Sequence, residues 1–178
     1  CVSNRGRERM VRRATLVLVL VALTGCRTGR NYSGLAGPRY VGGSAATMLG
    51  PDAGYRLRVV SFNIAFARHV EAAIAVLESD PAVGEADVIL LQEMDESGTR
   101  QVAHALGMTY VYYPGTFYLR TRRDFGNAVL SRWPIVDDAK ILLPHLGILG
   151  RLQRTATGAT LRVAGSLVRV YSAHLGTM

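Results

Sequence analysis

Several apolar segments of this sequence end in a polar residue, and this pattern constrains the fold more than any other feature. Three such segments end at Asn63, Glu93 and His174, and a fourth runs from a polar start at Asn127 into another apolar stretch. A buried strand can hold the side chain at its end rigidly, which a metal site or a general base requires. One such residue means little, but several in one short chain predict an active site.

Apolar spacing and turn residues predict two helices and seven strands. The helices are expected over residues 69–79 and 98–106. The strands are expected over residues 57–64, 86–92, 108–113, 127–132, 135–142, 159–164 and 167–173. We expect Pro114 to end the third strand. The β-α-β-α-β order followed by further strands disfavours a doubly wound parallel sheet and favours two packed sheets with helices outside.

The beginning of the sequence has the features of an export signal. Arg12 and Arg13 form a basic start, and residues 14–23 are an uncharged apolar run. A membrane-spanning helix needs about 20 apolar residues, so this run is too short to span and suits a signal peptide. We therefore expect a signal peptide over residues 10–25. Residues 1–9 are explained best as translated upstream of the true start.

The residues that follow the apolar run, Leu23-Thr24-Gly25-Cys26, resemble the bacterial lipobox. In that motif small residues precede a cysteine that is lipidated and becomes the mature N-terminus. The resemblance implies lipidation at Cys26 and an exported, membrane-anchored lipoprotein on the periplasmic or outer face. An ordinary signal peptide with a chance cysteine is the alternative.

Residues 26–54 are rich in Gly, Ser, Ala, Arg and Pro and lack apolar periodicity, so we expect a flexible tether. The folded domain is then expected over residues 55–178. The two cysteines, Cys1 and Cys26, predict neither a disulfide nor a cysteine metal site in the mature chain. The formal net charge of +8 falls to +4 without residues 1–25, and this modest positive balance is compatible with an anionic substrate but does not establish nucleic-acid binding.

Four motifs together resemble the endonuclease/exonuclease/phosphatase superfamily, which has the deoxyribonuclease-I-like fold. They are Ser61-Phe62-Asn63-Ile64, Leu91-Gln92-Glu93, residues 126–135 and Val170-Tyr171-Ser172-Ala173-His174-Leu175, in the family's order. The resemblance implies an α/β fold, a four-layer α-β-β-α sandwich of mixed and antiparallel sheets. The family's Gly-Asp-x-Asn and Ser-Asp-His motifs do not occur in the sequence, which implies that the C-terminal half of the fold is missing.

The resemblance also implies a role for each motif residue. Glu93 matches the family's main Mg²⁺ ligand, and Mn²⁺ is the alternative ion. A carboxylate suits Mg²⁺, which prefers hard oxygen ligands beside waters and phosphate. Asn63 matches the residue that assists the metal or orients the attacking water. His174 matches the histidine beside the scissile phosphate, which acts as an electrophile or leaving-group acid and titrates near neutrality.

Two further residues are candidates for contact with phosphate. Asn127 lies where the family contacts phosphate or braces the site, although a turn asparagine is nearly as good an explanation. Arg154 can bind phosphate through its planar guanidinium, with Arg151 as a rival position. The arginines at 120, 122 and 123 form a basic loop that is explained better as a solvated loop than as a substrate contact.

These implied roles predict a metal-dependent phosphoester hydrolase of phosphodiesterase, nuclease or phosphatase type. Its substrate is a nucleic acid, a phospholipid or a small phosphoester, its lipid anchor contacts the membrane, and the protein is expected to be a monomer. Because the family's general base lies outside this sequence, the chain alone is expected to be inactive and poorly stable. The alternative is a non-catalytic lipoprotein that keeps the fold as a binding module.

Overall fold

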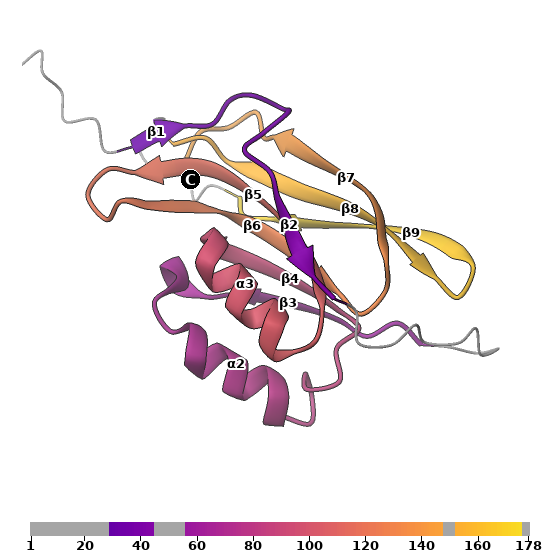
Figure 1. The fold of residues 1–178 in the computed structure, drawn as a ribbon. Helices are drawn as coiled ribbons and strands as arrows, with labels where there is room; N and C mark the ends of the chain where they lie inside the picture. The colour runs from indigo at the N-terminus through magenta and orange to yellow at the C-terminus, as the bar shows by residue number, and fades with distance from the viewer. Residues whose placement is uncertain (1–28, 45–55, 148–151, 176–178) are drawn as a thin grey trace, which may run out of the picture.

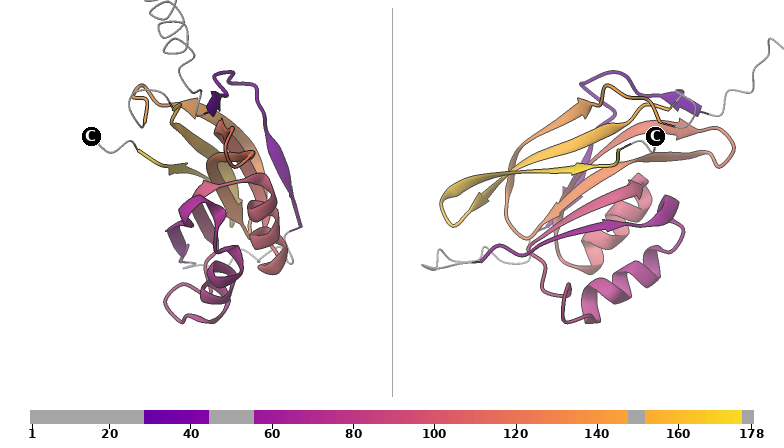
Figure 2. Two further views of the ribbon diagram at one scale, coloured as in Figure 1. Left: turned by 90° about the vertical axis from the view of Figure 1, so that its left-hand side faces the viewer. Right: turned by 180° about the vertical axis from the view of Figure 1, so that it is seen from behind.

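Two β-sheets form the centre of the computed structural model, which describes residues 29–44, 56–147 and 152–175 (Figures 1 and 2). The larger sheet has the strand order β1-β5-β6-β4-β3, with β2 also paired to β5, and the smaller sheet has the order β7-β8-β9. The strands are β1 (Gly29–Asn31), β2 (Tyr40–Gly43), β3 (Val59–Asn63), β4 (Val88–Met94), β5 (Thr109–Tyr118), β6 (Arg123–Ser131), β7 (Ile135–Leu142), β8 (Thr155–Val163) and β9 (Ser166–Ala173). The helical elements are η1 (Ala65–Ala67), α2 (Val70–Ser79) and α3 (Glu96–Ala105).

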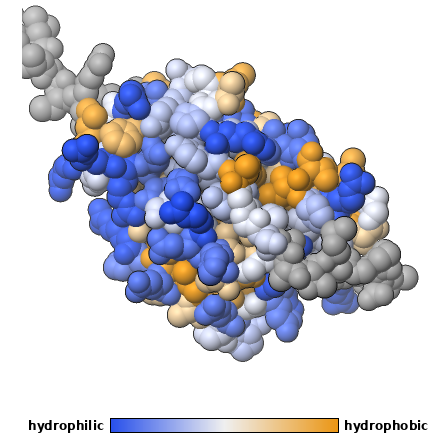
Figure 3. All heavy atoms as spheres, in the orientation of Figure 1, coloured by the Kyte–Doolittle hydropathy of each residue, from blue (hydrophilic) through white to orange (hydrophobic). Residues whose placement is uncertain are grey.

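The elements form three layers. The helices α2 and α3 cover one face of the larger sheet, and the smaller sheet packs on its other face (Figure 2). Val70, Leu77 and Val102 bring the helices into the first core, and between the sheets Val129 meets Leu161 in the second. The surface seen in Figure 3 is mainly hydrophilic, with only small apolar groups. Burial of apolar side chains in these two cores is the main term that stabilises the fold.

The expected α/β fold with two packed sheets of mixed and antiparallel strands is confirmed. β3 and β4 are parallel and are joined through α2, whereas the remaining strand pairs are antiparallel. Every expected helix and strand is present, with ends shifted by a few residues. In the described part of the chain the helices pack on the larger sheet alone, so these residues form three of the four layers expected. No described helix has the length and apolar character needed to span a membrane.

Pro114 does not end its strand, contrary to expectation. β5 continues through Pro114 to Tyr118, and its register with β6 shifts between Pro114 and Thr116. A β-bulge of this kind absorbs a residue that cannot donate a ladder hydrogen bond. At the same place Gly126 lies close to the β5 backbone, where an added Cβ would stand 2.3 Å from the Tyr113 carbonyl oxygen. The hairpin β5–β6 is therefore longer than the sequence pattern indicated.

The expectation of a tether is wrong for residues 29–44. β1 and β2 pair antiparallel with successive parts of β5, so they belong to the larger sheet. Arg39 donates to both carboxylate oxygens of Asp138, at 2.7 and 2.6 Å, and Lys140 Nζ donates to the Tyr32 carbonyl at 2.5 Å. Backbone pairing and polar contacts hold this segment, which explains why it lacks apolar periodicity. The proposed signal peptide, Cys26 and the other parts of the tether lie outside the described residues.

Candidate active site

Three of the predicted site residues meet at one end of the sandwich. Asn63 ends β3, Glu93 lies near the end of β4, and His174 follows β9. Asn63 Nδ2 donates to Glu93 Oε1 at 3.1 Å, and His174 Nε2 lies 3.6 Å from the same oxygen. Residues that are far apart in the sequence therefore present a carboxylate, an amide and an imidazole to one another.

Strand pairing and one buried polar cluster produce this convergence. β3 and β4 are parallel, and Asn63 is in register with Gln92, so their carboxyl ends reach the same edge of the sheet. Ser172 Oγ on β9 donates to the Leu91 carbonyl at 2.7 Å, and Gln92 Nε2 donates to the hydroxyl oxygens of Ser61 and Ser172, each at 3.2 Å. These bonds fix the smaller sheet against the larger one directly below the site.

Glu93 adopts an unusual backbone conformation. Its φ is 59°, and the register between β4 and β6 shifts between Leu91 and Met94. A left-handed conformation at a residue other than glycine costs on the order of 1–3 kcal/mol and is found mostly at functional sites. Glu93 Oε2 accepts the N–H of Phe66 at 3.0 Å, and Phe66 is itself left-handed with φ 64°. The bulge at Glu93 and the turn at Phe66 therefore support one another and aim the carboxylate.

The amide of Asn63 is already engaged on both sides. Its Oδ1 accepts the N–H of Ala65 at 2.9 Å, while its Nδ2 donates to Glu93. An amide nitrogen cannot ligate a metal ion. In this geometry Asn63 orients the Glu93 carboxylate. The role implied for it was to assist the metal or to orient the attacking water, and both stay predictions, since Oδ1 keeps a second lone pair.

Arg154 and His174 form a second pair beside Glu93. Arg154 Nη1 lies 3.1 Å from His174 Nδ1, and the Arg154 guanidinium stacks 5.5 Å from the centre of the Phe125 ring. The guanidinium is a permanent donor, so Nδ1 carries the lone pair and the proton of the neutral ring is on Nε2, which faces Glu93. Gly147 makes room for this arrangement, because an added Cβ would lie 2.3 Å from Arg154 Nε.

The environment of His174 disfavours its protonated form. Burial lowers the pKa of His174, the charge of Arg154 lowers it further, and Glu93 opposes both with a smaller effect. The imidazole is therefore neutral at pH 7 and presents Nε2–H as a hydrogen-bond donor. The shift is downward from the near-neutral value that the resemblance implies for this histidine.

Asn127 is a structural brace between the two sheets. Asn127 is 3% exposed, and its side-chain Nδ2 donates to the Thr155 backbone carbonyl at 2.6 Å. The backbone carbonyl of Asn127 accepts the hydroxyl of Thr157 at 2.7 Å. These bonds hold β6 against β8, which fits the bracing role of Asn127, while contact with phosphate stays a prediction. Arg151, the rival phosphate ligand, lies outside the described residues.

An aromatic cluster beside the site was not found from the sequence. The Phe125 ring lies 5.1 Å from Phe66, 5.4 Å from Tyr118 and 6.0 Å from the His174 ring. Burial raises the pKa of Tyr118, and its hydroxyl has no hydrogen-bond partner among the described residues. These positions are dispersed in the sequence: Phe125 is buried on β6, whereas Phe66 is 40% exposed on η1.

The described residues offer one carboxylate, that of Glu93, to a divalent ion. They contain no group of three His, Cys, Asp or Glu side chains placed to hold an ion. Glu93 nevertheless fits as a single ligand, because Mg²⁺ is often bound by one or two carboxylates together with waters and phosphate. Its side chain is 13% exposed, so it can be reached from solvent.

The fold and the site point to one family. The sequence model of the Endonuclease/Exonuclease/phosphatase family matches residues 60–173, and the chain belongs to this family. A comparison with curated proteins found no match.

Solved structures support the fold. An endonuclease/exonuclease/phosphatase family protein from Leptotrichia buccalis is similar with a TM-score of 0.55 and 16% sequence identity, and the match covers 68% of this chain and 55% of that protein. Sphingomyelinase C from Streptomyces griseocarneus has a TM-score of 0.51 and 19% identity, covering 68% and 49%. A humanised D. rerio TDP2 with 14 mutations has a TM-score of 0.51 and 16% identity, covering 68% and 48%. This chain thus spans about half the length of these solved structures.

Proposed function

We propose that this chain is the N-terminal part of a metal-dependent phosphoester hydrolase, made as an exported lipoprotein anchored through Cys26. The observation that supports this most is the convergence of Asn63, Glu93, His174 and Arg154 at one end of the sandwich. Glu93 would hold a divalent ion, Mg²⁺ or Mn²⁺, which supplies positive charge to polarise a phosphoryl oxygen when it is bound.

The other residues of the site would bind and stabilise the phosphoryl group. His174 presents Nε2–H toward the site, and Arg154 keeps its ring in that tautomer. Donors that are fixed before the reaction stabilise charge developing on phosphoryl oxygens without reorganisation. Asn63 holds the Glu93 carboxylate in place. The Asp-His general base of the family would come from outside these residues, so we expect the chain alone to be inactive.

The substrate class follows from the same reasoning. Phosphodiesters of nucleic acids, phospholipids and small phosphoesters all present the phosphoryl oxygens that this site suits. Anchoring at a membrane favours a phospholipid or a small phosphoester. The inner and outer membranes are equally compatible with the proposed anchor, and a monomer is expected.

The test is Glu93→Gln in the protein expressed from the full reading frame. We expect the rate of bis-p-nitrophenyl phosphate hydrolysis with Mg²⁺ or Mn²⁺ to fall by at least about 100-fold. Substitution of a residue that only hydrogen-bonds to a metal ligand already lowers metal affinity or activity by about 10–100-fold. Glu71→Gln, on the exposed start of α2, is the control and should keep full activity. Unchanged turnover in the Glu93 variant would disprove the proposal. Phosphate binding without turnover in the unmodified protein would favour the binding module.

A further inference from the structure

β1 and the β5–β6 hairpin lie at the same end of the sandwich (Figures 1 and 2). Gly29 of β1 is in register with Tyr118, the last residue of β5, and the hairpin loop 119–122 follows directly. β5 is ten residues long, so its two ends lie about 30 Å apart, since each strand residue advances about 3.3 Å. Arg162 N on β8 donates to the carbonyl of Pro134, which follows the far end of β6, so the β8–β9 hairpin lies at the opposite end (Figure 1).

The start of β1 lies close in the sequence to the proposed lipid anchor. Two residues separate Cys26 from Gly29, and this stretch spans at most about 11 Å, because one residue spans at most about 3.6 Å. The acyl chains of a lipidated cysteine stay in the bilayer. A lipid on Cys26 therefore holds the end of the sandwich that carries β1 and the loop 119–122 close to the membrane, and it leaves the opposite end farther away.

The hairpin loop is basic and carries one exposed apolar side chain. Its sequence is Leu119-Arg120-Thr121-Arg122, all four residues are exposed, and Leu119 is 48% exposed. Arg120 and Arg122 form no ion pair with a carboxylate of the described residues, whereas five other arginines each pair with an aspartate or a glutamate. Arginines without a protein carboxylate, next to an exposed apolar side chain, suit the interface of an anionic bilayer.

β1 and the turn after β3 extend this basic surface. The Arg30 guanidinium is 5.8 Å from the centre of the Phe117 ring, and Arg30 itself is exposed. Phe66 is 40% exposed, its ring lies 5.8 Å from that of Tyr118, and the exposed Arg68 lies 5.2 Å from the centre of the Phe66 ring. These side chains and those of the loop form a surface that we call the basic end, namely Arg30, Phe66, Arg68, Leu119, Arg120 and Arg122.

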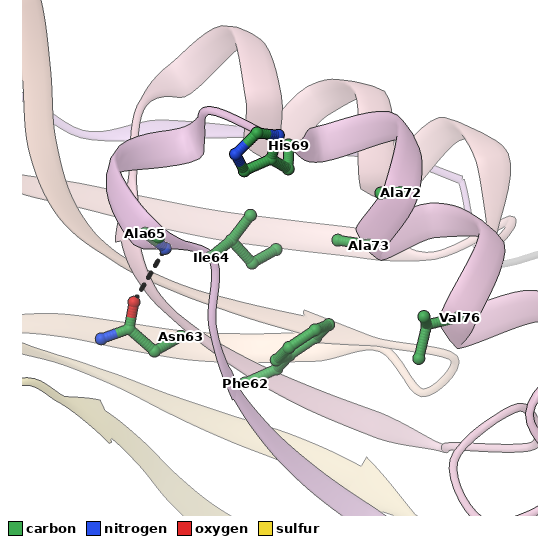
Figure 4. A pocket seen from close by; sticks show the side chains of 8 residues that line it. All are labelled: Phe62, Asn63, Ile64, Ala65, His69, Ala72, Ala73 and Val76. Atoms are coloured by element: carbon green, nitrogen blue, oxygen red, sulfur yellow. Dashed lines mark hydrogen bonds between the residues drawn. The ribbon is translucent and has the colours of Figure 1, made fainter.

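The active site lies at this end of the sandwich as well. β4 runs antiparallel to β6, and Met94, next to Glu93, is in register with Gly126, near the start of β6. Asn63 ends β3 beside Glu93, and its Oδ1 accepts the N–H of Ala65 at the turn into η1 (Figure 4). A domain that is held to a membrane by its basic end therefore has its site close to the lipid headgroups.

We propose that the basic end binds anionic phospholipid headgroups of the membrane that holds the anchor, so that the domain stands end-on with its active site at the bilayer surface. This inference rests on the proposed function, because it needs the lipid on Cys26. The arginines are attracted by the surface charge of the bilayer, and Leu119 enters the boundary between headgroups and acyl chains. The opposite end also carries exposed side chains of both kinds, such as Leu167 at 66% and Arg162. The position of β1 next to Cys26 therefore selects the basic end.

Quenching of tryptophan emission by brominated phospholipid tests the orientation. In the lipidated protein expressed from the full reading frame, Leu119→Trp places a tryptophan at the basic end and Leu167→Trp places one on the β8–β9 hairpin. The unmodified protein, which contains Trp133, supplies the background. In vesicles of phosphatidylglycerol and brominated phosphatidylcholine we expect quenching in the Leu119→Trp variant and none beyond background in Leu167→Trp. Equal quenching of the two variants, quenching of neither or quenching of Leu167→Trp alone would overturn the inference.

A matched pair of double variants, each made in the Leu119→Trp protein, tests the role of charge. Arg120→Gln with Arg122→Gln should lower the ratio of docked to undocked protein about 30-fold, since each arginine near an anionic surface contributes about fivefold. Arg56→Gln with Arg162→Gln removes two exposed charges near the start of β3 and the end of β8. Those positions lie more than a Debye length from the bilayer, so the ratio should change by less than about twofold. Equal effects of the two double variants would overturn the inference.

These readouts do not depend on activity. Mass spectrometry reports whether Cys26 carries lipid, and a Cys26 without lipid would refute both the proposed anchor and this inference. End-on docking of a protein without hydrolase activity would refute the proposed hydrolase and leave this inference standing. An active, lipidated hydrolase whose Leu119→Trp variant is not quenched would refute this inference alone. A change in the emission of that variant on addition of duplex DNA would then assign the arginines to nucleic acid.

Discussion

The Nη1 atom of Arg154 lies 3.1 Å from the Nδ1 atom of His174, and this contact determines what the histidine can do. A permanent cation that donates to Nδ1 leaves the ring neutral and places its proton on Nε2. Arg154 is itself fixed by burial and by stacking on Phe125. The pair therefore presents a donor toward Glu93 without a need for protonation.

Removal of the Arg154 charge should raise the pKa of His174. Burial and Arg154 both lower this pKa, and Glu93 raises it, so Arg154→Met leaves the carboxylate as the main charged neighbour. Titration of the His174 ring proton by NMR measures the change. Arg162→Met, an exposed position on β8, is the control and should leave the titration unchanged. An unaltered or lower pKa in the Arg154 variant would show that the contact is absent in solution.

The lowered pKa of His174 should make the protein less stable in mild acid. The unfolded chain binds a proton near the ordinary histidine pKa of about 6.5, whereas the folded site binds it only at lower pH. The unfolded state thus holds more protons in this window, and the free energy of unfolding falls as the pH drops below about 6.5 toward the folded pKa. Urea unfolding at several pH values measures this slope.

His174→Gln should reduce that slope and leave stability nearly constant across the window. His104→Gln, at the exposed C-terminal end of α3, controls for loss of an imidazole elsewhere. If the slope is the same in the unmodified protein and in His174→Gln, another group is responsible.

Asn127→Ala should destabilise the fold by about 1–3 kcal/mol, because the Thr155 carbonyl loses a buried partner. Chemical denaturation measures the loss. Asn63→Ala provides the contrast, since this exposed residue orients Glu93 and should affect turnover more than stability. An Asn127 variant as stable as the unmodified protein would contradict the bracing role.

Much of the larger sheet and the site could be predicted because the signals are local. An apolar strand followed by Asn63 or Glu93 indicates both the strand and its carboxyl end, and parallel pairing brings those ends together. The left-handed turn at Phe66 gave no such signal, because it has no glycine and depends on a bond from a distant carboxylate. Pro114 stays within β5 for a similar reason, since a bulge formed with β6 accommodates it.

Residues 29–44 show the same limit more clearly. Their composition is that of a linker, and the partners that order them lie along β5 and β7. Neither a hydrogen-bonding edge nor a buried carboxylate can be located from a segment's own composition. The segment was missed because its stabilising contacts are distant in sequence and mostly polar, with Tyr40 as the residue that packs against the core.

Arg39→Ala tests whether this segment belongs to the folded domain in solution. Arg39 binds both oxygens of Asp138, whose side chain is 7% exposed, and Tyr113 also donates to that carboxylate at 2.5 Å. Loss of the arginine leaves a buried charge with one partner. Removal of one member of a fully buried pair costs 3–5 kcal/mol, and since Arg39 is 45% exposed we expect a smaller loss of about 1–3 kcal/mol.

The effect of Arg39→Ala should depend on pH. Arg39 is the main cause of the lowered pKa of Asp138. The stabilisation that Arg39 gives through Asp138 is therefore fully present above the ordinary aspartate pKa of about 3.9. It is lost as the pH falls through the lower pKa that Asp138 has in the folded protein. Arg169→Ala removes a matched ion pair to Asp137, which is 63% exposed, and should change stability little at any pH. If both variants behave alike at pH 7, residues 29–44 are not bound to the sheet.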